Sequence, residues 1–191
     1  MIVMDIYCDG GTAGPNPSRL GGAWCWCGIV DDEIVREETG TIFPSDIGLP
    51  TVSCNITELL AAIHALEEMP DSWNGRLYTD SLVTRSRLLK KNPKLTGVPQ
   101  KLRDRLFAVR KRFPHIKAIQ IAGHPTAIDL ARGYRVNKNS KRIPTSVHHV
   151  HCDAICTEII CQIESGAIVT AVDADDEYDD TPLFCCTPGE K

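Results

Sequence analysis

The stretch Ile-Val-Met-Asp-Ile-Tyr-Cys-Asp-Gly-Gly, at residues 2–11, is the one around which the rest of the chain is organised. Its first part is apolar and β-prone, which predicts a strand that ends on the carboxylate of Asp9. Gly10 and Gly11 lack a Cβ atom and predict a sharp turn after the strand. In open α/β sheets, ligands and metals bind at such strand ends, although an Asp-Gly pair is also common in ordinary turns.

The composition is typical of an ordinary soluble protein with one domain. The chain has 191 residues, of which 42% are hydrophobic and 24% are charged, which suffices for one well-packed core. No basic segment precedes an apolar run near the N-terminus, and no apolar run approaches the roughly 18–20 residues of a membrane helix. We therefore expect a cytoplasmic protein without a membrane partner. Nine cysteines, an odd number at scattered apolar positions, favour reduced thiols.

Charge is distributed unevenly along the chain. Residues 173–180 hold six acids, and we expect residues 166–191 to form an acidic, flexible tail behind a single domain at residues 1–165. Residues 85–142 hold 17 lysines and arginines against two acids. Such a local excess is expected of a surface that meets phosphates, although solvated helix faces would explain it too.

Apolar periodicity predicts an α/β fold with a five-stranded mixed sheet, in which three antiparallel strands precede parallel strands, flanked by helices. Strands are predicted at residues 2–9, 21–30, 34–42, 75–80 and 116–122. Helices are predicted at residues 53–69, 81–91, 99–112 and around 152–163. Residues 44–52 read as irregular, and residues 123–147 read as a long basic loop insertion without regular structure.

Four carboxylates lie at the starts or ends of these elements: Asp9, Glu58, Asp80 and Asp153. Glu58 lies in the first turn of its helix, at the edge of the apolar stripe, so it points towards whatever that helix packs on. Favourable interaction with the helix dipole would explain Glu58 equally well. Asp153 lies beside the apolar stripe of the last helix in the same way.

These pieces, in this order, resemble the ribonuclease H type 1 family over residues 1–165. The motifs that carry the resemblance are Tyr-Cys-Asp9-Gly-Gly, Gly-Pro-Asn16-Pro, Asn55-Ile-Thr-Glu58, Thr-Asp80-Ser81, Ala-Gly123-His124 and Cys-Asp153-Ala-Ile-Cys. The resemblance implies an RNase H-like fold. It also implies an endonuclease that hydrolyses the RNA strand of RNA–DNA hybrids and leaves 5′-phosphate and 3′-hydroxyl ends.

The resemblance implies two Mg²⁺ ions, for which Mn²⁺ can substitute. Two ions about 4 Å apart clamp an in-line phosphoryl displacement, and Mg²⁺ prefers hard oxygen ligands. Asp9 would bridge both ions, Glu58 and Asp80 would bind the ion on the leaving-group side, and Asp153 would bind the ion that activates water. His124 matches the family's mobile-loop histidine, which assists proton transfer or product release.

Substrate contacts follow from the same resemblance. Asn16 and Asn55 would contact the 2′-hydroxyl groups that distinguish RNA from DNA, and Ser53 would contact a DNA phosphate. The expected contact residues are Gly10, Gly11, Asn16, Ser53, Asn55, Ser81, Arg132, Arg135 and Lys138. Trp24 and Trp26 would either stack on sugars or lie in the core.

The chain departs from the family in two places. Many bacterial members place the loop histidine much closer to the last aspartate, whereas 28 residues separate His124 from Asp153 here. His148, His149 and His151 lie nearer and are alternatives. The basic helix-loop with which some members grip the hybrid is abbreviated around residues 90–101, and we expect residues 132–142 to replace part of it.

Other readings remain open. Close-set His149, His151, Cys152, Cys156 and Cys161 would suit a zinc ion, although no clean C-x₂-C pair is present. Residues 179–184 resemble acidic-then-apolar peptides that dock on replication proteins. Alternative functions are a nuclease of this fold that cuts branched DNA and a hybrid-binding module that does not cut. Four carboxylates held together without metal are costly, which disfavours the module. We expect a monomer.

Overall fold

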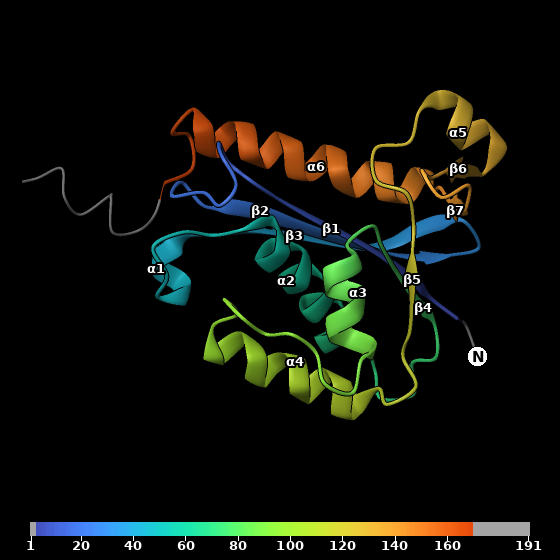
Figure 1. Ribbon diagram of the computed structural model, residues 1–191, viewed down its shortest axis with the longest axis horizontal. Coiled ribbons are helices and arrows are strands. Elements are labelled where there is room, and N and C mark those ends of the chain that lie inside the picture. The colour runs from blue at the N-terminus through green and yellow to red at the C-terminus, as the bar shows by residue number, and fades with distance from the viewer. Residues whose placement is uncertain (1–2, 170–191) are drawn as a thin grey trace, which may run out of the picture.

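The computed structural model describes residues 3–169 and contains the predicted mixed sheet (Figure 1). Its strand order is β3-β2-β1-β4-β5. The strands are β1 (Asp5–Thr12), β2 (Gly22–Val30), β3 (Glu33–Ile42), β4 (Arg76–Thr79) and β5 (Lys117–Gln120). Strands β1 to β3 pair antiparallel, whereas β4 pairs parallel with β1 and with β5. The predicted fold class is therefore confirmed.

Helices cover both faces of the sheet (Figure 1). Helix α6 (Val147–Glu164) lies on one face, and α2 (Cys54–Glu67), α3 (Leu82–Leu89) and α4 (Gln100–Arg112) lie on the other. The core beneath α2 is built from large aliphatic side chains such as Leu59, Ile63, Leu66, Leu77 and Leu106. The smaller core beneath α6 is built largely from cysteines: Cys25, Cys27, Cys152 and Cys156. These thiols are free and act as small hydrophobic residues, as expected.

Strand β1 does not end at Asp9, so the turn predicted at Gly10 and Gly11 is wrong. The strand continues to Thr12 and pairs with β2 along its whole length, with Asp9 opposite Cys25. The glycines serve close packing instead. A Cβ atom at Gly10 would lie 2.5 Å from the main-chain carbon of Thr57, so glycine is what allows α2 to approach β1.

The prediction of a structureless segment at residues 123–147 is also wrong. It contains α5 (Ala127–Arg132) and a hairpin of β6 (Tyr134–Val136) and β7 (Arg142–Pro144). Thr126 caps α5 by accepting a hydrogen bond from the main-chain N–H of Asp129, and Gly133 ends the helix with a φ of 74°. These elements are too short to produce a visible apolar period. Likewise, α1 (Pro44–Ile47) interrupts the segment that was expected to be irregular.

Both tryptophans of β2 belong to the core rather than to a sugar-stacking surface. Trp26 is fully buried, and Trp24 is 5% exposed and stacks on His64 with ring centroids 4.1 Å apart.

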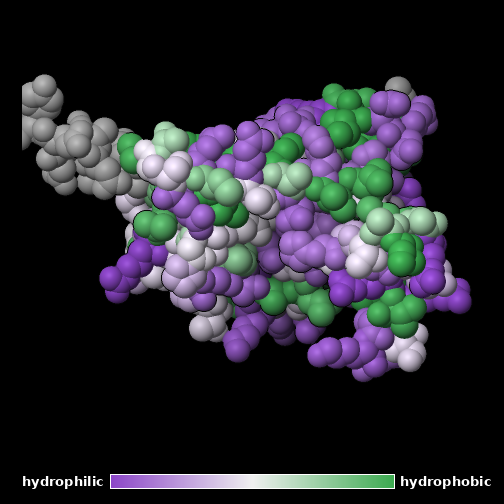
Figure 2. Space-filling view, turned by 90° about the horizontal axis from the view of Figure 1, so that it is seen from above, coloured by the Kyte–Doolittle hydropathy of each residue, from purple (hydrophilic) through white to green (hydrophobic). Residues whose placement is uncertain are grey.

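On the side of the molecule seen from above, hydrophilic side chains predominate and hydrophobic residues form small separate groups (Figure 2). No helix within residues 3–169 is long and apolar enough to cross a membrane. Of the predicted acidic tail at residues 166–191, residues 170–191 lie outside the described part of the chain.

Candidate active site

The parallel pairing of β1 with β4 brings Asp9 and Asp80 together. Tyr7 and Tyr78 are register partners, and their rings stack with centroids 4.5 Å apart. Asp9 and Asp80 each follow two residues later. Because β4 ends at Thr79 while β1 continues, Asp80 leaves the sheet beside Asp9. Glu58 comes from the first part of α2, whose main chain packs against Gly10, next to Asp9.

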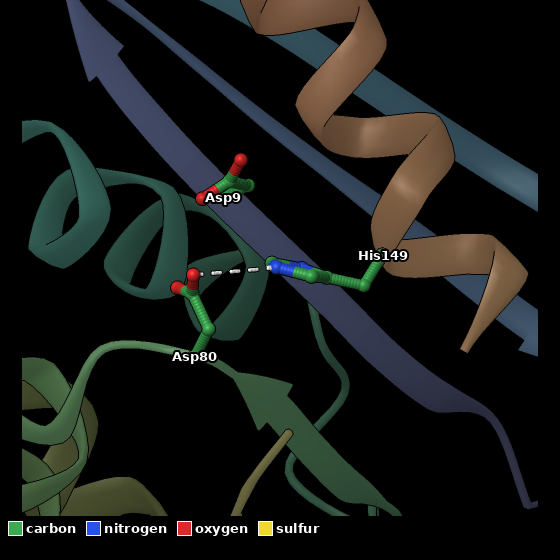
Figure 3. A group of neighbouring side chains, drawn as sticks. All are labelled: Asp9, Asp80 and His149. Atoms are coloured by element: carbon green, nitrogen blue, oxygen red, sulfur yellow. Dashed lines mark ion pairs between the residues drawn. The ribbon is translucent and has the colours of Figure 1, made fainter. Parts of the chain in front are cut away.

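Helix α6 contributes His149 and Asp153, which are one turn apart and so lie on the same side of the helix. Its first turn is capped by Ser146, whose Oγ accepts a hydrogen bond from the main-chain N–H of His148. The thiol of Cys152 donates to the main-chain oxygen of Tyr7, which fastens α6 to β1. Figure 3 shows His149 reaching from α6 towards Asp80, with Asp9 beside them.

Asp9, Asp80 and His149 form a candidate metal site. One ligand atom from each lies within 4.8 Å of the others, and within residues 3–169 this is the one such group of three. Buried oxygens without a hydrogen-bond partner surround the site: Oε2 of Glu58 and Oδ1 of Asp80. Such buried acceptors are costly unless something satisfies them, and carboxylate oxygens are the ligands that divalent cations prefer. The donor set therefore fits a divalent cation.

Burial and mutual repulsion perturb these carboxyl groups. Desolvation, together with the charges of Asp80 and Asp153, raises the pKa of Asp9 to about 6. Desolvation, together with the charges of Asp80 and Asp9, raises the pKa of Glu58 to about 7. Raised carboxyl pKa values of this kind are characteristic of functional sites in which several carboxylates are buried close together.

The pKa values of Asp80 and His149 shift in the opposite direction to the shift that burial alone would cause. Desolvation raises the pKa of Asp80, but the neighbouring His149 outweighs it, so that the pKa is lowered. Desolvation lowers the pKa of His149, but the carboxylates of Asp80 and Asp9 outweigh it, so that the pKa is raised. Nε2 of His149 lies 3.6 Å from Oδ2 of Asp80.

The predicted loop histidine, His124, lies beside Asp153. Its Nδ1 is 3.2 Å from Oδ2 of Asp153, and its side chain is 80% exposed. Arg135 of the β6–β7 hairpin holds this loop by donating from Nη1 to the main-chain oxygens of Gly123 (3.0 Å) and His124 (3.4 Å). The long separation in sequence between His124 and Asp153 is therefore occupied by α5 and the hairpin.

The alternative histidines divide between different roles. His148 contacts Asp32 in the β2–β3 turn at 2.9 Å, and His151 pairs with Glu37 of β3. His149 alone of the three faces the carboxylates. Its spacing of four residues from Asp153 was the signal in the sequence that could have identified it. Nothing in the described part of the chain gathers the cysteines and histidines of α6 into a zinc site, and Cys161 is exposed.

The expected substrate residues lie around this site in different environments. Asn55 is exposed in the first turn of α2, and Asn16 accepts a hydrogen bond on Oδ1 from the main-chain N–H of Cys54. Ser53 is the N-cap residue of α2 without a side-chain cap bond. Ser81 is buried and caps α3 through Thr84.

Many of the basic residues predicted to meet phosphates have structural roles instead. The side chains that donate to main-chain carbonyl oxygens are Arg85, Arg87, Arg103, Arg110 and Arg112. The basic residues of α5 and the hairpin are exposed: Arg132, Arg135, Lys138, Lys141 and Arg142. A groove of about 310 Å³, lined by Asp80, Gly123, Arg135 and Lys138 among others, connects the hairpin to Asp80.

No family model and no curated protein matches the sequence. Solved structures do match. The N-terminal RNase H domain of a Mycobacterium tuberculosis protein, solved as a fusion with maltose-binding protein, is 15% identical with a TM-score of 0.54. The match covers 88% of this chain and 100% of that chain. LC11-RNase H1, isolated from compost by a metagenomic approach, is 15% identical with a TM-score of 0.51, covering 85% and 98%. At this identity the likeness is one of fold, and it agrees with the strand order: the chain has the ribonuclease H fold.

Proposed function

We propose that the protein is an endonuclease that hydrolyses the RNA strand of RNA–DNA hybrids with the help of divalent cations. The observation that carries the proposal is the convergence of Asp9, Asp80 and Glu58, with buried unpartnered oxygens, where β1 and β4 separate. This convergence occurs on a fold shared with ribonuclease H domains. The shared fold and the convergence of carboxylates together support the proposal.

Asp9, Glu58, Asp80 and Asp153 would hold the cations. When bound, two Mg²⁺ or Mn²⁺ ions would supply an activated water and a stabilised leaving 3′-oxygen, giving 5′-phosphate and 3′-hydroxyl ends. Because the pKa of Asp9 is raised to about 6 and that of Glu58 to about 7, cation binding at or below these pH values would displace protons from the two groups. Glycine at positions 10 and 123 keeps the surrounding main chain close to Glu58 and Asp80.

His124 is the proposed proton-transfer group. Oδ2 of Asp153 accepts a hydrogen bond from its Nδ1, which orients the ring and leaves Nε2 directed away from that contact. Since the side chain is mostly exposed, Nε2 can exchange protons with solvent. His124 would therefore donate a proton to the leaving oxygen and take up another proton from solvent between turnovers.

Recognition of the hybrid would use two surfaces. Asn16 and Asn55, both next to the start of α2, would contact 2′-hydroxyl groups of the RNA strand. Arg132, Arg135 and Lys138 of the α5–hairpin segment would contact phosphates along the groove that leads to Asp80. The basic hairpin would thus replace part of the grip that other members of the family obtain elsewhere.

An end-labelled RNA–DNA hybrid, incubated with Mg²⁺ or Mn²⁺ beside duplex DNA, duplex RNA and a branched DNA, tests the substrate class. We expect cleavage of the RNA strand of the hybrid alone, its loss in Asp80→Asn, and its retention in Asp104→Asn, a matched change on the exposed side of α4. If branched DNA alone were cleaved, the assignment of the fold would stand, but the substrate would be branched DNA and not the hybrid. Binding of the hybrid without cleavage would identify a binding module.

A further inference from the structure

His149 is a buried histidine of helix α6. Its side chain is 2% exposed, and its Nδ1 has no hydrogen-bond partner. Its Nε2 faces Asp80 and, with ligand atoms of Asp9 and Asp80, belongs to a group that spans no more than 4.8 Å (Figure 3). Because a buried ring nitrogen without a hydrogen-bond partner is costly, the role of His149 follows from the chemistry of the site rather than from packing.

The separation between His149 and Asp80 is that of an ion pair rather than of a hydrogen bond (Figure 3). At 3.6 Å, Nε2 and Oδ2 are too far apart for a good hydrogen bond. Two ligand atoms that each lie about 2.0–2.2 Å from one ion, at angles of about 90–120°, are roughly 2.8–3.8 Å apart. The observed distance is thus one at which a carboxylate oxygen and an imidazole nitrogen can share a cation.

Ligand chemistry then distinguishes between cations. Mg²⁺ prefers oxygen ligands and retains its waters, whereas imidazole nitrogen favours transition-metal ions. We propose that His149 is a direct metal ligand, and that Asp9, Asp80 and His149 form a mixed nitrogen–oxygen site that selects Mn²⁺ over Mg²⁺. The inference deepens the proposed function and rests on it in one respect, that the carboxylates of this site bind the divalent cation.

The environment of His149 supports a fixed ligand. It lies in the first two turns of an 18-residue helix that is capped by Ser146 and fastened to β1 by Cys152. Asp153 lies one turn further on the same side. The imidazole is therefore held towards Asp9 and Asp80 before any cation arrives, which lowers the cost of ordering it on binding.

Binding of Mn²⁺ alone to the full-length protein, followed by electron paramagnetic resonance, tests the proposal without any catalytic readout. We expect His149→Asn to weaken Mn²⁺ binding about tenfold or more, and to change Mg²⁺ binding, measured by competition, by less than about threefold. His151→Asn, on the same helix but paired with Glu37, is the matched control and should leave both affinities unchanged. Circular dichroism checks that each variant is folded.

Electron spin-echo modulation provides a second readout on the wild-type protein. Bound Mn²⁺ should show coupling to a directly bound ¹⁴N nucleus that persists in His124→Asn and disappears in His149→Asn. If His149→Asn does not fold, persistence of the coupling in His124→Asn still supports the proposal. Wild-type protein without nitrogen coupling, or equal losses of Mn²⁺ and Mg²⁺ affinity in His149→Asn, would overturn it.

The two proposals fail in different ways. If nitrogen coupling were observed but the hybrid were not cleaved, His149 would still be a metal ligand and the proposed function would be refuted. If the hybrid were cleaved but no nitrogen coupling were observed, the proposed function would stand and His149 would not be a metal ligand. His149 would then be a buried cation that balances the charges of Asp9 and Asp80.

Discussion

Gly123 lies directly against the carboxylate of Asp80: a Cβ atom at position 123 would be 2.2 Å from Oδ2. The same residue accepts a hydrogen bond on its main-chain oxygen from Arg135. The strand end that carries Asp80, the loop that carries His124 and the basic hairpin are therefore coupled through one glycine. Displacement of any one of them would disturb the other two.

Gly123→Ala should lower kcat/KM for hybrid cleavage about 100-fold, because the new methyl group displaces Asp80 from its position beside Asp9. Steady-state kinetics on a labelled hybrid measures the change. Gly28→Ala is the matched control, since the three atoms nearest to its added Cβ all belong to the flexible side chain of Met4. Equal activity of the two variants would show that Asp80 does not depend on this contact.

Metal affinity and kcat/KM should rise together between about pH 5.5 and pH 8. The pKa of Asp9 is about 6 and that of Glu58 is about 7, so both carboxyl groups hold protons at the acid end of this range. Cations bind the deprotonated groups, and protons therefore compete with them. Metal titrations and rate profiles at constant ionic strength measure the effect; profiles that are flat from pH 5.5 would contradict it.

Asp9→Asn should stabilise the metal-free protein at pH 8. The pKa of Asp9 is about 6 in the native state against an ordinary value of 3.8, so the native state binds the proton more tightly and loses stability as the pH rises through this interval. Removing the charge should raise the free energy of unfolding at pH 8 by about 1–3 kcal/mol, and by much less near pH 4. Urea denaturation in a chelator at both pH values measures this, with Asp104→Asn as the control. A destabilised variant at pH 8 would contradict it.

His124→Ala should lower kcat about 10- to 100-fold and leave KM nearly unchanged, because the ring is exposed and acts on protons rather than on substrate binding. His115→Ala, an exposed histidine before β5, is the control. If kcat were unaffected at every pH, the proton-transfer role would be refuted.

Lys138→Ala combined with Lys141→Ala should weaken hybrid binding and flatten its dependence on salt. Each lost phosphate contact should reduce the slope of log K against log salt by about 0.7–0.9. Lys101→Ala with Lys111→Ala removes the same charge from exposed positions on α4. Binding titrations at several salt concentrations compare the pairs, and identical slopes would show that the hairpin meets no phosphate.

Much of the fold could be predicted because its elements carry local signals. Ser81 and the apolar positions of α4 marked helices whose observed bounds differ from the predicted ones by no more than two residues. The order of the elements predicted one mixed sheet with antiparallel strands before parallel ones, and the register of β1 and β4 within that sheet puts Asp9 and Asp80 side by side. Patterns of this kind depend on few residues and little tertiary context.

The remaining features depend on contacts that no local pattern contains. Gly10 signals a turn by itself, and only the main chain of α2 explains why a strand needs glycine there. The six-residue α5 and the three-residue strands of the hairpin are too short for periodicity. His149 was one of three candidate histidines until the orientation of α6 separated it from His148 and His151.

Incubation of wild-type protein and Asp80→Asn with an RNA–DNA hybrid labelled on each strand, followed by analysis of the product ends, is the most direct test of the site. Metal-dependent cleavage of the RNA strand to 5′-phosphate and 3′-hydroxyl ends, absent in Asp80→Asn, is the expected result. An intact hybrid in the presence of either Mg²⁺ or Mn²⁺, or cleavage that survives in Asp80→Asn, would contradict it.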